Sequence, residues 1–172
     1  MNIFKKVSYK VKRIYNSYSF GDYMRTAYLS PRQVVLITSR FDNQDNVLPV
    51  DWHIPLSFSP KLYAVCLESG NHSSAMILKS GVFVVNFMPA ECEKQIIECG
   101  RLSGKDTDKF GVTGLEKSEA SKINAPIIKN AVGYLECKLV DTITTGDHTL
   151  FIGEVLAEKE AGNAERLFHI TN

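Results

Sequence analysis

The pattern of hydrophobic and polar positions predicts a chain built mostly from β-strands. Strand-like runs, either alternating or continuously apolar, cover residues 33–40, 61–68, 82–87, 132–140 and 148–159. Turn-forming residues separate them, at 41–46 (FDNQDN) and at the Thr-Gly pair 145–146. About seven short strands with two or three helices are typical of a barrel. We therefore expect a mainly β fold, a β-barrel with helical decorations.

Two segments have helical character. Ser73 or Ser74 is suited to cap a short helix that runs to Lys79 and is ended by Gly81. Residues 90–99 follow an amphipathic helical period. The polar stretch 101–113 is expected to be a loop, and it is long for a simple connection.

Length and composition favour one domain. The chain has 172 residues, of which 44% are hydrophobic, so it can bury a genuine core, whereas two domains would each be undersized. We expect the domain to span 31–172 and to follow an N-terminal extension, 1–30. The extension is basic and aromatic, which suits either contact with anionic lipid or a partner, or packing against the barrel or a second subunit; we favour the packing.

Charge, apolar run length and cysteine spacing argue against several classes of protein. The net charge of +1 gives no bulk electrostatic argument for nucleic acid, and the apolar runs are far shorter than the roughly 20 residues of a membrane span. No signal peptide is visible. The four cysteines form no CxxC pair, and Cys92 and Cys99 lie too far apart for a routine disulfide. We expect a reduced, cytoplasmic protein with no metal site.

Three segments between these elements carry polar groups suited to a ligand. In 47–59 (VLPVDWHIPLSFS), Pro49 removes a ladder donor, so nearby backbone groups are free to meet a flat heterocycle; otherwise Trp52 is a core anchor and His53 a surface residue. In 69–74 (SGNHSS), small donors at a helix start suit a phosphate, or simply cap the helix. In 101–110, the cations either meet a phosphate or the electron-rich edge of a heterocycle, or are solvated.

His148 is a candidate for proton or hydrogen-bond donation. It follows the turn Gly146-Asp147 at the start of a strand, and histidine exchanges protons near neutral pH. A lone histidine is more often structural. Strand alternation would turn the Asp147 side chain away from it.

The order of these segments resembles the flavin reductase-like family with the FMN-binding split barrel, in particular its flavoredoxin-type members. The resemblance runs from Pro31 to about Leu167. It is carried by VLPVDWHIPLSFSPKLYAVCLE, GVFVVNF, SGKDTDKFG, NAPIIKNAVGYLECKLV and GDHTLFIGEV.

The resemblance implies a homodimer that binds FMN, with NAD(P)H as the electron donor. Leu48, Pro49, Val50, Asp51 and Trp52 would contact the isoalloxazine, largely through backbone. The phosphate or ribityl chain would lie among Ser69, Asn71, His72, Ser73, Ser103, Lys105 and Lys109. His148 would lie near the flavin or the nicotinamide.

Two positions depart from the family pattern. Asp51 stands where small or hydroxylated residues are common, and an acid beside a flavin could lower its reduction potential. The segment 69–74 lacks the arginine or lysine often found there.

Three functions follow as hypotheses. The first is an NAD(P)H-dependent FMN reductase, in which the cofactor does the chemistry and no protein nucleophile is needed. The second is a flavoredoxin-like carrier that exchanges electrons with a redox protein partner. The third is a barrel that has lost the flavin and keeps only dimerisation.

Overall fold

The computed structural model describes residues 12–15, 31–160 and 162–170. Its main element is a seven-stranded antiparallel sheet in the order β4-β3-β7-β10-β11-β6-β5. The strands are β3 (Val35–Phe41), β4 (Gln44–Val50), β5 (His53–Phe58), β6 (Lys61–Glu68), β7 (Val82–Phe87), β10 (Gly133–Thr145) and β11 (His148–Lys159). The predicted mainly β class is confirmed.

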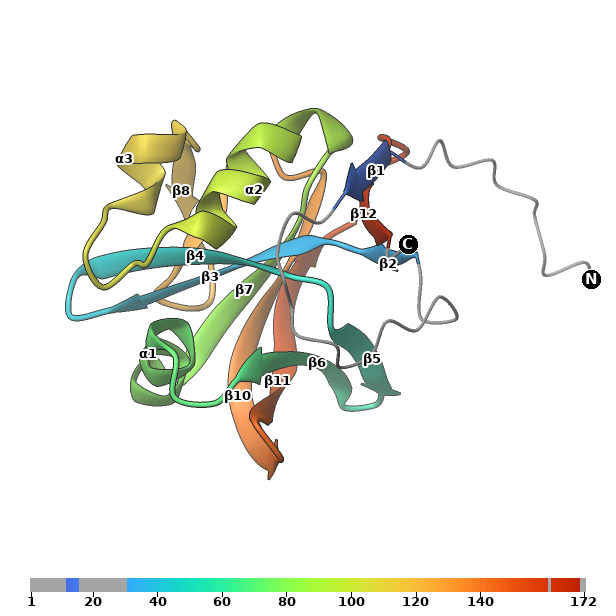
Figure 1. The fold of residues 1–172 in the computed structure, drawn as a ribbon. Helices are drawn as coiled ribbons and strands as arrows, with labels where there is room; N and C mark the ends of the chain where they lie inside the picture. Colours follow the sequence, from blue (N-terminus) through green and yellow to red (C-terminus); the bar gives the residue numbers. More distant parts are fainter. Residues whose placement is uncertain (1–11, 16–30, 161, 171–172) are drawn as a thin grey trace, which may run out of the picture.

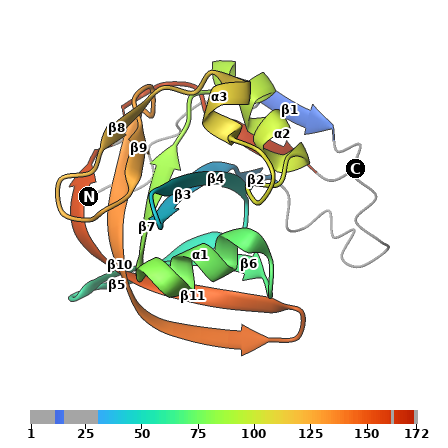
Figure 2. The same cartoon turned by 90° about the vertical axis from the view of Figure 1, so that its left-hand side faces the viewer.

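The sheet curls around one apolar interior, which we call the barrel core (Figure 2). Strands near opposite ends of the sheet order share this core, because Val35 of β3 and Val65 of β6 belong to the same cluster. The helix α1 (His72–Ser80) contributes Ile77. The other members are Ile37, Val50, Tyr63, Leu67, Phe83, Val85, Cys137 and Phe151.

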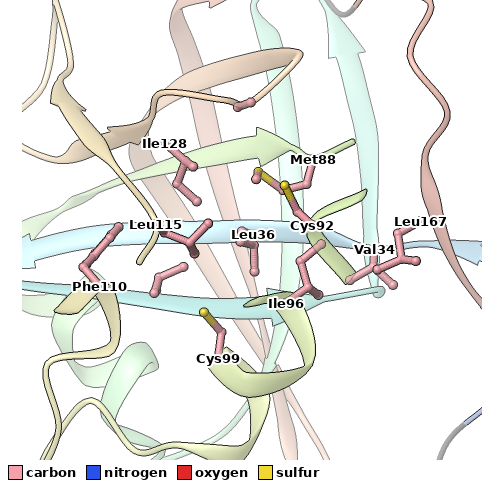
Figure 3. Close-up of a cluster of buried hydrophobic side chains, with 12 residues drawn as sticks. Val34, Leu36, Met88, Cys92, Ile96, Cys99, Phe110, Leu115, Ile128 and Leu167 are labelled. Carbon is pink, nitrogen blue, oxygen red and sulfur yellow. The ribbon is translucent and has the colours of Figure 1, made fainter. Parts of the chain in front are cut away.

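A second apolar cluster, the outer core, lies on the other face of β3 (Figure 3). Alternate side chains of this segment enter the two cores: Val35 and Ile37 enter the barrel core, whereas Val34 and Leu36 enter the outer core. The outer core is covered by η2 (Ala90–Cys92), α2 (Glu93–Arg101) and α3 (Lys109–Thr113). The helices α1 and α2 thus lie on opposite sides of β3 and β4 (Figure 1).

Smaller strands complete the fold. The hairpin β8 (Lys117–Glu119) and β9 (Pro126–Ile128) lies beside the main sheet. Near the C-terminus, β12 (Leu167–Ile170) pairs on one edge with β2 (Arg32–Gln33) and on the other, in parallel, with β1 (Lys12–Tyr15). Apart from β1, the N-terminal extension lies outside the described residues.

Several predicted boundaries need correction. Pro49 does not interrupt a strand: it pairs with Leu36 inside β4, an edge strand that tolerates a missing donor. The turn expected over 41–46 shrinks to Asp42 and Asn43, whose positive φ values of 51° and 59° suit a tight hairpin. The expected loop 101–113 contains α3, and the turn after β10 lies one residue later than expected, at Gly146 and Asp147.

The cysteines are all unpaired thiols, as expected. Burial raises the pKa of Cys99 to about 11 and that of Cys137 to about 12, so both are inert at neutral pH. Among the described residues, no helix is long and apolar enough to cross a membrane. That part of the chain also holds no cluster of side chains suited to a metal ion.

Candidate functional site

Backbone hydrogen bonds bring the segments 47–59 and 69–74 and the turn before His148 together at one end of β6. The Cys66 amide donates to the Trp52 carbonyl at 2.8 Å, which fixes the bend between β4 and β5. The Ser69 amide donates to the Asp147 carbonyl at 2.9 Å, which fixes the turn between β10 and β11. The Ser69 hydroxyl lies 2.8 Å from that of Thr149. Segments distant in sequence therefore converge there.

Trp52 and His148 form a stacked pair at this junction. Their ring centroids are 4.8 Å apart and their planes make an angle of 28°. Trp52 is 38% exposed, so it is not the core anchor that one interpretation suggested. Asp147 Oδ1 accepts from His148 Nδ1 at 2.6 Å. The expectation that Asp147 would turn away is wrong, because Asp147 belongs to the turn and strand alternation does not apply to it.

Polar side chains at the start of α1 face β4. Asn71, rather than Ser73 or Ser74, is the N-cap: its Oδ1 accepts from the Ser74 amide at 2.8 Å. The buried Ser73 hydroxyl accepts from Asn46 Nδ2 at 2.7 Å. The Ser74 hydroxyl donates to the Glu68 carbonyl and so joins the helix to the end of β6. The first amides of a helix lack intrahelical partners and favour an anion.

The loop after α2 folds over this helix start. Gln44 Nε2 donates to the Gly104 carbonyl at 3.1 Å. A Cβ on Gly104 would lie 2.1 Å from Asn46 Oδ1 and 3.4 Å from His72 Cδ2, so only glycine allows this approach. Ser103 and Lys105 flank Gly104 and are exposed, and the Lys105 amide donates to the Ser103 hydroxyl.

Three buried polar atoms at this place have no hydrogen-bond partner among the described residues: Ser39 Oγ, Asn46 Oδ1 and His72 Nε2. Ser39 and Asn46 face each other across β3 and β4, and Asn46 and His72 meet at Gly104. A buried polar atom without a partner is costly, and a ligand that supplies hydroxyls or a phosphate would satisfy such atoms. The residues therefore fit the phosphate-bearing chain of FMN.

Lys109 does not join this group. Its side chain is buried, and Nζ donates to the Val47 and Cys99 carbonyls, each at 2.9 Å. Burial lowers the pKa of Lys109. This placement contradicts both expectations for Lys109, a contact with phosphate and a solvated side chain. The ammonium instead links α2 to β4 beneath the loop.

Side chains of the segment 48–50 are used within the fold. Leu48 and Val50 pack in the barrel core, and Pro49 lies against α2, where a Cβ on Gly100 would be 3.1 Å from its Cγ. This leaves the backbone as the part of the segment that can meet a ligand.

Asp51 and His53 flank Trp52, and both are held by partners. Arg32 Nε donates to Asp51 Oδ2 at 3.0 Å, and His169 Nδ1 lies 2.5 Å from the same oxygen. Burial opposes ionisation of Asp51, but these two partners outweigh it and lower the pKa. His53 is not a surface residue: it lies 2.6 Å from the Tyr63 hydroxyl and 3.0 Å from the Gln33 carbonyl.

Sequence reasoning missed the β4 side of the site. Asn46, Gln44 and Gly104 were not candidates, because the segment 41–46 has turn-like composition and Gly104 lies in a stretch expected to be a loop. The hairpin at Asp42 and Asn43 was the available signal, since an Asp-Asn pair that fits a two-residue turn starts β4 early enough to place Asn46 in the sheet.

Comparison with known proteins agrees with this geometry. The model of the flavin reductase like domain matches residues 25–171. The chain belongs to the flavin reductase-like family. An uncharacterised protein of Archaeoglobus fulgidus is 39% identical over 129 residues, which cover 75% of this chain and 72% of that protein. A ferric-chelate reductase (NAD(P)H) of the same organism is 29% identical over 113 residues, covering 65% and 66%.

Solved structures share the fold. An FMN-binding protein from Thermus thermophilus, with bound 1-cyclohex-2-enone, has a TM-score of 0.72 at 26% identity and covers 78% of this chain and 74% of its own. Flavoredoxin from Methanosarcina acetivorans has a TM-score of 0.70 at 27% identity, covering 75% and 68%. The split-barrel architecture expected from the resemblance is confirmed.

Proposed function

We propose that this chain is an NAD(P)H-dependent FMN reductase. The observation that carries the proposal is the group of unpartnered buried atoms, Ser39 Oγ, Asn46 Oδ1 and His72 Nε2, beside the start of α1 and under the Gly104 loop. A phosphate and a polyol chain supply the partners that these atoms lack. The ferric-chelate reductase (NAD(P)H) among the relatives supports the choice of donor.

Each residue of the site is assigned a role from its position. Asn71, His72, Ser73 and Ser103 hold the phosphate and ribityl groups, with Lys105 supplying a positive charge from the exposed rim. The backbone of 48–52 lies along the isoalloxazine, and Ser69 links the phosphate segment to the His148 turn. When bound, FMN supplies the acceptor for a hydride.

Trp52 and His148 form the wall against which a nicotinamide ring packs. Stacking is the favoured contact of flat rings, and the exposed face of Trp52 is available for it. Asp147 orients His148 through Nδ1, so that Nε2 is the nitrogen that faces a ligand. The chain needs no nucleophile for this chemistry, because the transfer occurs between two cofactors.

We further propose that the protein is a homodimer, formed through the outer face of the sheet. Ile143, Leu150 and Cys66 are register partners across β10, β11 and β6, and Trp52 lies beside Cys66. Ile152, Ala64 and Ile54 form the next row. Their sequence neighbours Val65, Leu67 and Phe151 enter the barrel core, so these rows face outward.

Trp52, Ile54 and Ile143 on this face are 38%, 53% and 50% exposed. Exposed apolar area of this kind suits contact with a second copy of the chain.

A flavoredoxin-like electron carrier is the second candidate, favoured by the likeness to flavoredoxin. Anaerobic stopped-flow mixing of the FMN-loaded protein with NADH or NADPH separates the two. Rapid bleaching of the flavin is expected for a reductase. Bleaching only by a reduced redox protein would establish the carrier, and a chain that takes up no FMN would be a barrel without flavin. The unpaired cysteines suit a reducing compartment in either case.

A further inference from the structure

Asp51 is the centre of an ion cluster at the bend between β4 and β5. Arg32 Nε lies 3.0 Å from Asp51 Oδ2, and His169 Nδ1 lies 2.5 Å from the same oxygen. The side chains are mostly buried, with exposures of 19% for Arg32, 23% for Asp51 and 16% for His169. Such a cluster is screened less by salt than a surface pair.

The cluster joins segments from both ends of the domain. Arg32 and His169 are register partners in β2 and β12, so the small sheet presents both basic groups to one carboxylate. Asp51 lies between Val50, which is packed in the barrel core, and Trp52, which is stacked on His148. The carboxylate is therefore fixed on the segment proposed to lie along the isoalloxazine.

We propose that Arg32, beside the Asp51–His169 hydrogen bond, neutralises Asp51 and thereby sets the reduction potential of the flavin bound at this bend. The inference rests on the proposed function. Reduction adds negative charge to the isoalloxazine, so a bare carboxylate nearby opposes it and a bare guanidinium favours it. In the native cluster the two charges largely cancel. The acid at position 51 therefore does not lower the potential as its charge alone would.

The test is the midpoint potential of bound FMN in two variants, measured at about pH 8 so that a carboxylate is ionised. Asp51→Asn leaves Arg32 uncompensated, so the midpoint should rise. Arg32→Met leaves Asp51 with less compensation, so the midpoint should fall. A general loosening of the site would not give opposite signs, because both variants break the same pair. Arg32→Gln offers a second route to a lower midpoint if Arg32→Met does not fold, because it removes the same positive charge.

Two controls match these variants. Arg32→Lys keeps the charge and should leave the midpoint close to that of the native protein. Arg40→Met removes a similar pair at the other end of β4, where Arg40 Nε lies 2.6 Å from Asp45 Oδ1, and should not shift the midpoint.

Shifts of the same sign in Asp51→Asn and Arg32→Met, no shift in either, or an equal shift in Arg40→Met would overturn the inference while leaving the proposed function intact. A native protein that binds no FMN would overturn both.

Discussion

The Trp52 indole lies on the His148 imidazole, with 4.8 Å between the ring centroids. This contact joins the β4–β5 bend to the β10–β11 turn and gives the site an aromatic wall. Asp147 holds the outer edge of the imidazole through a 2.6 Å hydrogen bond. The pair accounts for two residues, Trp52 and His148, that the sequence could connect only through a family resemblance.

His148→Ala should slow the reduction of bound FMN without a matching loss of FMN affinity. His148 is proposed to position the nicotinamide, and a misplaced reacting group can cost about 100-fold in rate, so we expect flavin bleaching by NADH to slow by at least about tenfold. FMN affinity should change by less than about threefold, because the phosphate segment is untouched. Stopped-flow bleaching and equilibrium titration measure the two effects, and equal losses in both would contradict the assigned role.

Gly104→Ala should weaken FMN binding by more than about tenfold, since the new methyl group must displace Asn46 or lift the loop. The matched control is Gly162→Ala, where an added Cβ meets nothing within 4 Å. Isothermal titration with FMN compares the two variants. An affinity of Gly104→Ala equal to that of Gly162→Ala would show that the loop does not cover the flavin.

Lys109→Met should destabilise the fold by about 2–3 kcal/mol, because the Val47 and Cys99 carbonyls lose their buried donor. The control is Lys105→Met, in which an exposed cation is removed. That variant should unfold within about 0.5 kcal/mol of the native protein, and it should lose affinity for FMN but not for riboflavin, which lacks the phosphate. Urea denaturation gives the first comparison. A Lys109→Met variant as stable as the native protein would show that the buried ammonium is dispensable.

How far the sequence predicts the fold differs between local and long-range features. The bounds of β6 and β7 agree with prediction because both strands are short apolar runs ended by turn residues. The cap of α1 was missed by two residues, since Asn71 and the serines after it are all good caps. The burial of Lys109 and the contact between Gly104 and Asn46 depend on how distant segments pack, and composition does not encode that packing.

Acid should destabilise the protein partly through His53. Burial lowers the pKa of His53 below its ordinary 6.5, and this effect outweighs the Gln33 carbonyl and the Asp51 carboxylate, which both raise it. The unfolded chain then binds the proton more tightly, so this contribution is present above about pH 6.5 and is lost as the pH falls through the folded pKa, at up to about 1.4 kcal/mol per pH unit. His53→Gln should flatten that slope in urea denaturation. An unchanged slope would remove His53 as the cause.

Ile54→Asp should convert the proposed dimer into a monomer, because it places a charge on the outer face, where Trp52, Ile54 and Ile143 are exposed. Val112→Asp is the control: Val112 is 58% exposed but belongs to α3, on another side of the molecule. Analytical ultracentrifugation distinguishes the two variants. A native chain that is already monomeric, or an Ile54→Asp variant that remains dimeric, would contradict the proposed interface.

The most direct test of the flavin site uses Trp52, the only tryptophan of the chain. FMN bound along 48–52 lies beside this indole, so titration of the flavin-free protein should quench tryptophan emission and saturate at one FMN per chain. An emission that does not change through the titration, together with free-flavin fluorescence that stays undiminished, would contradict the account.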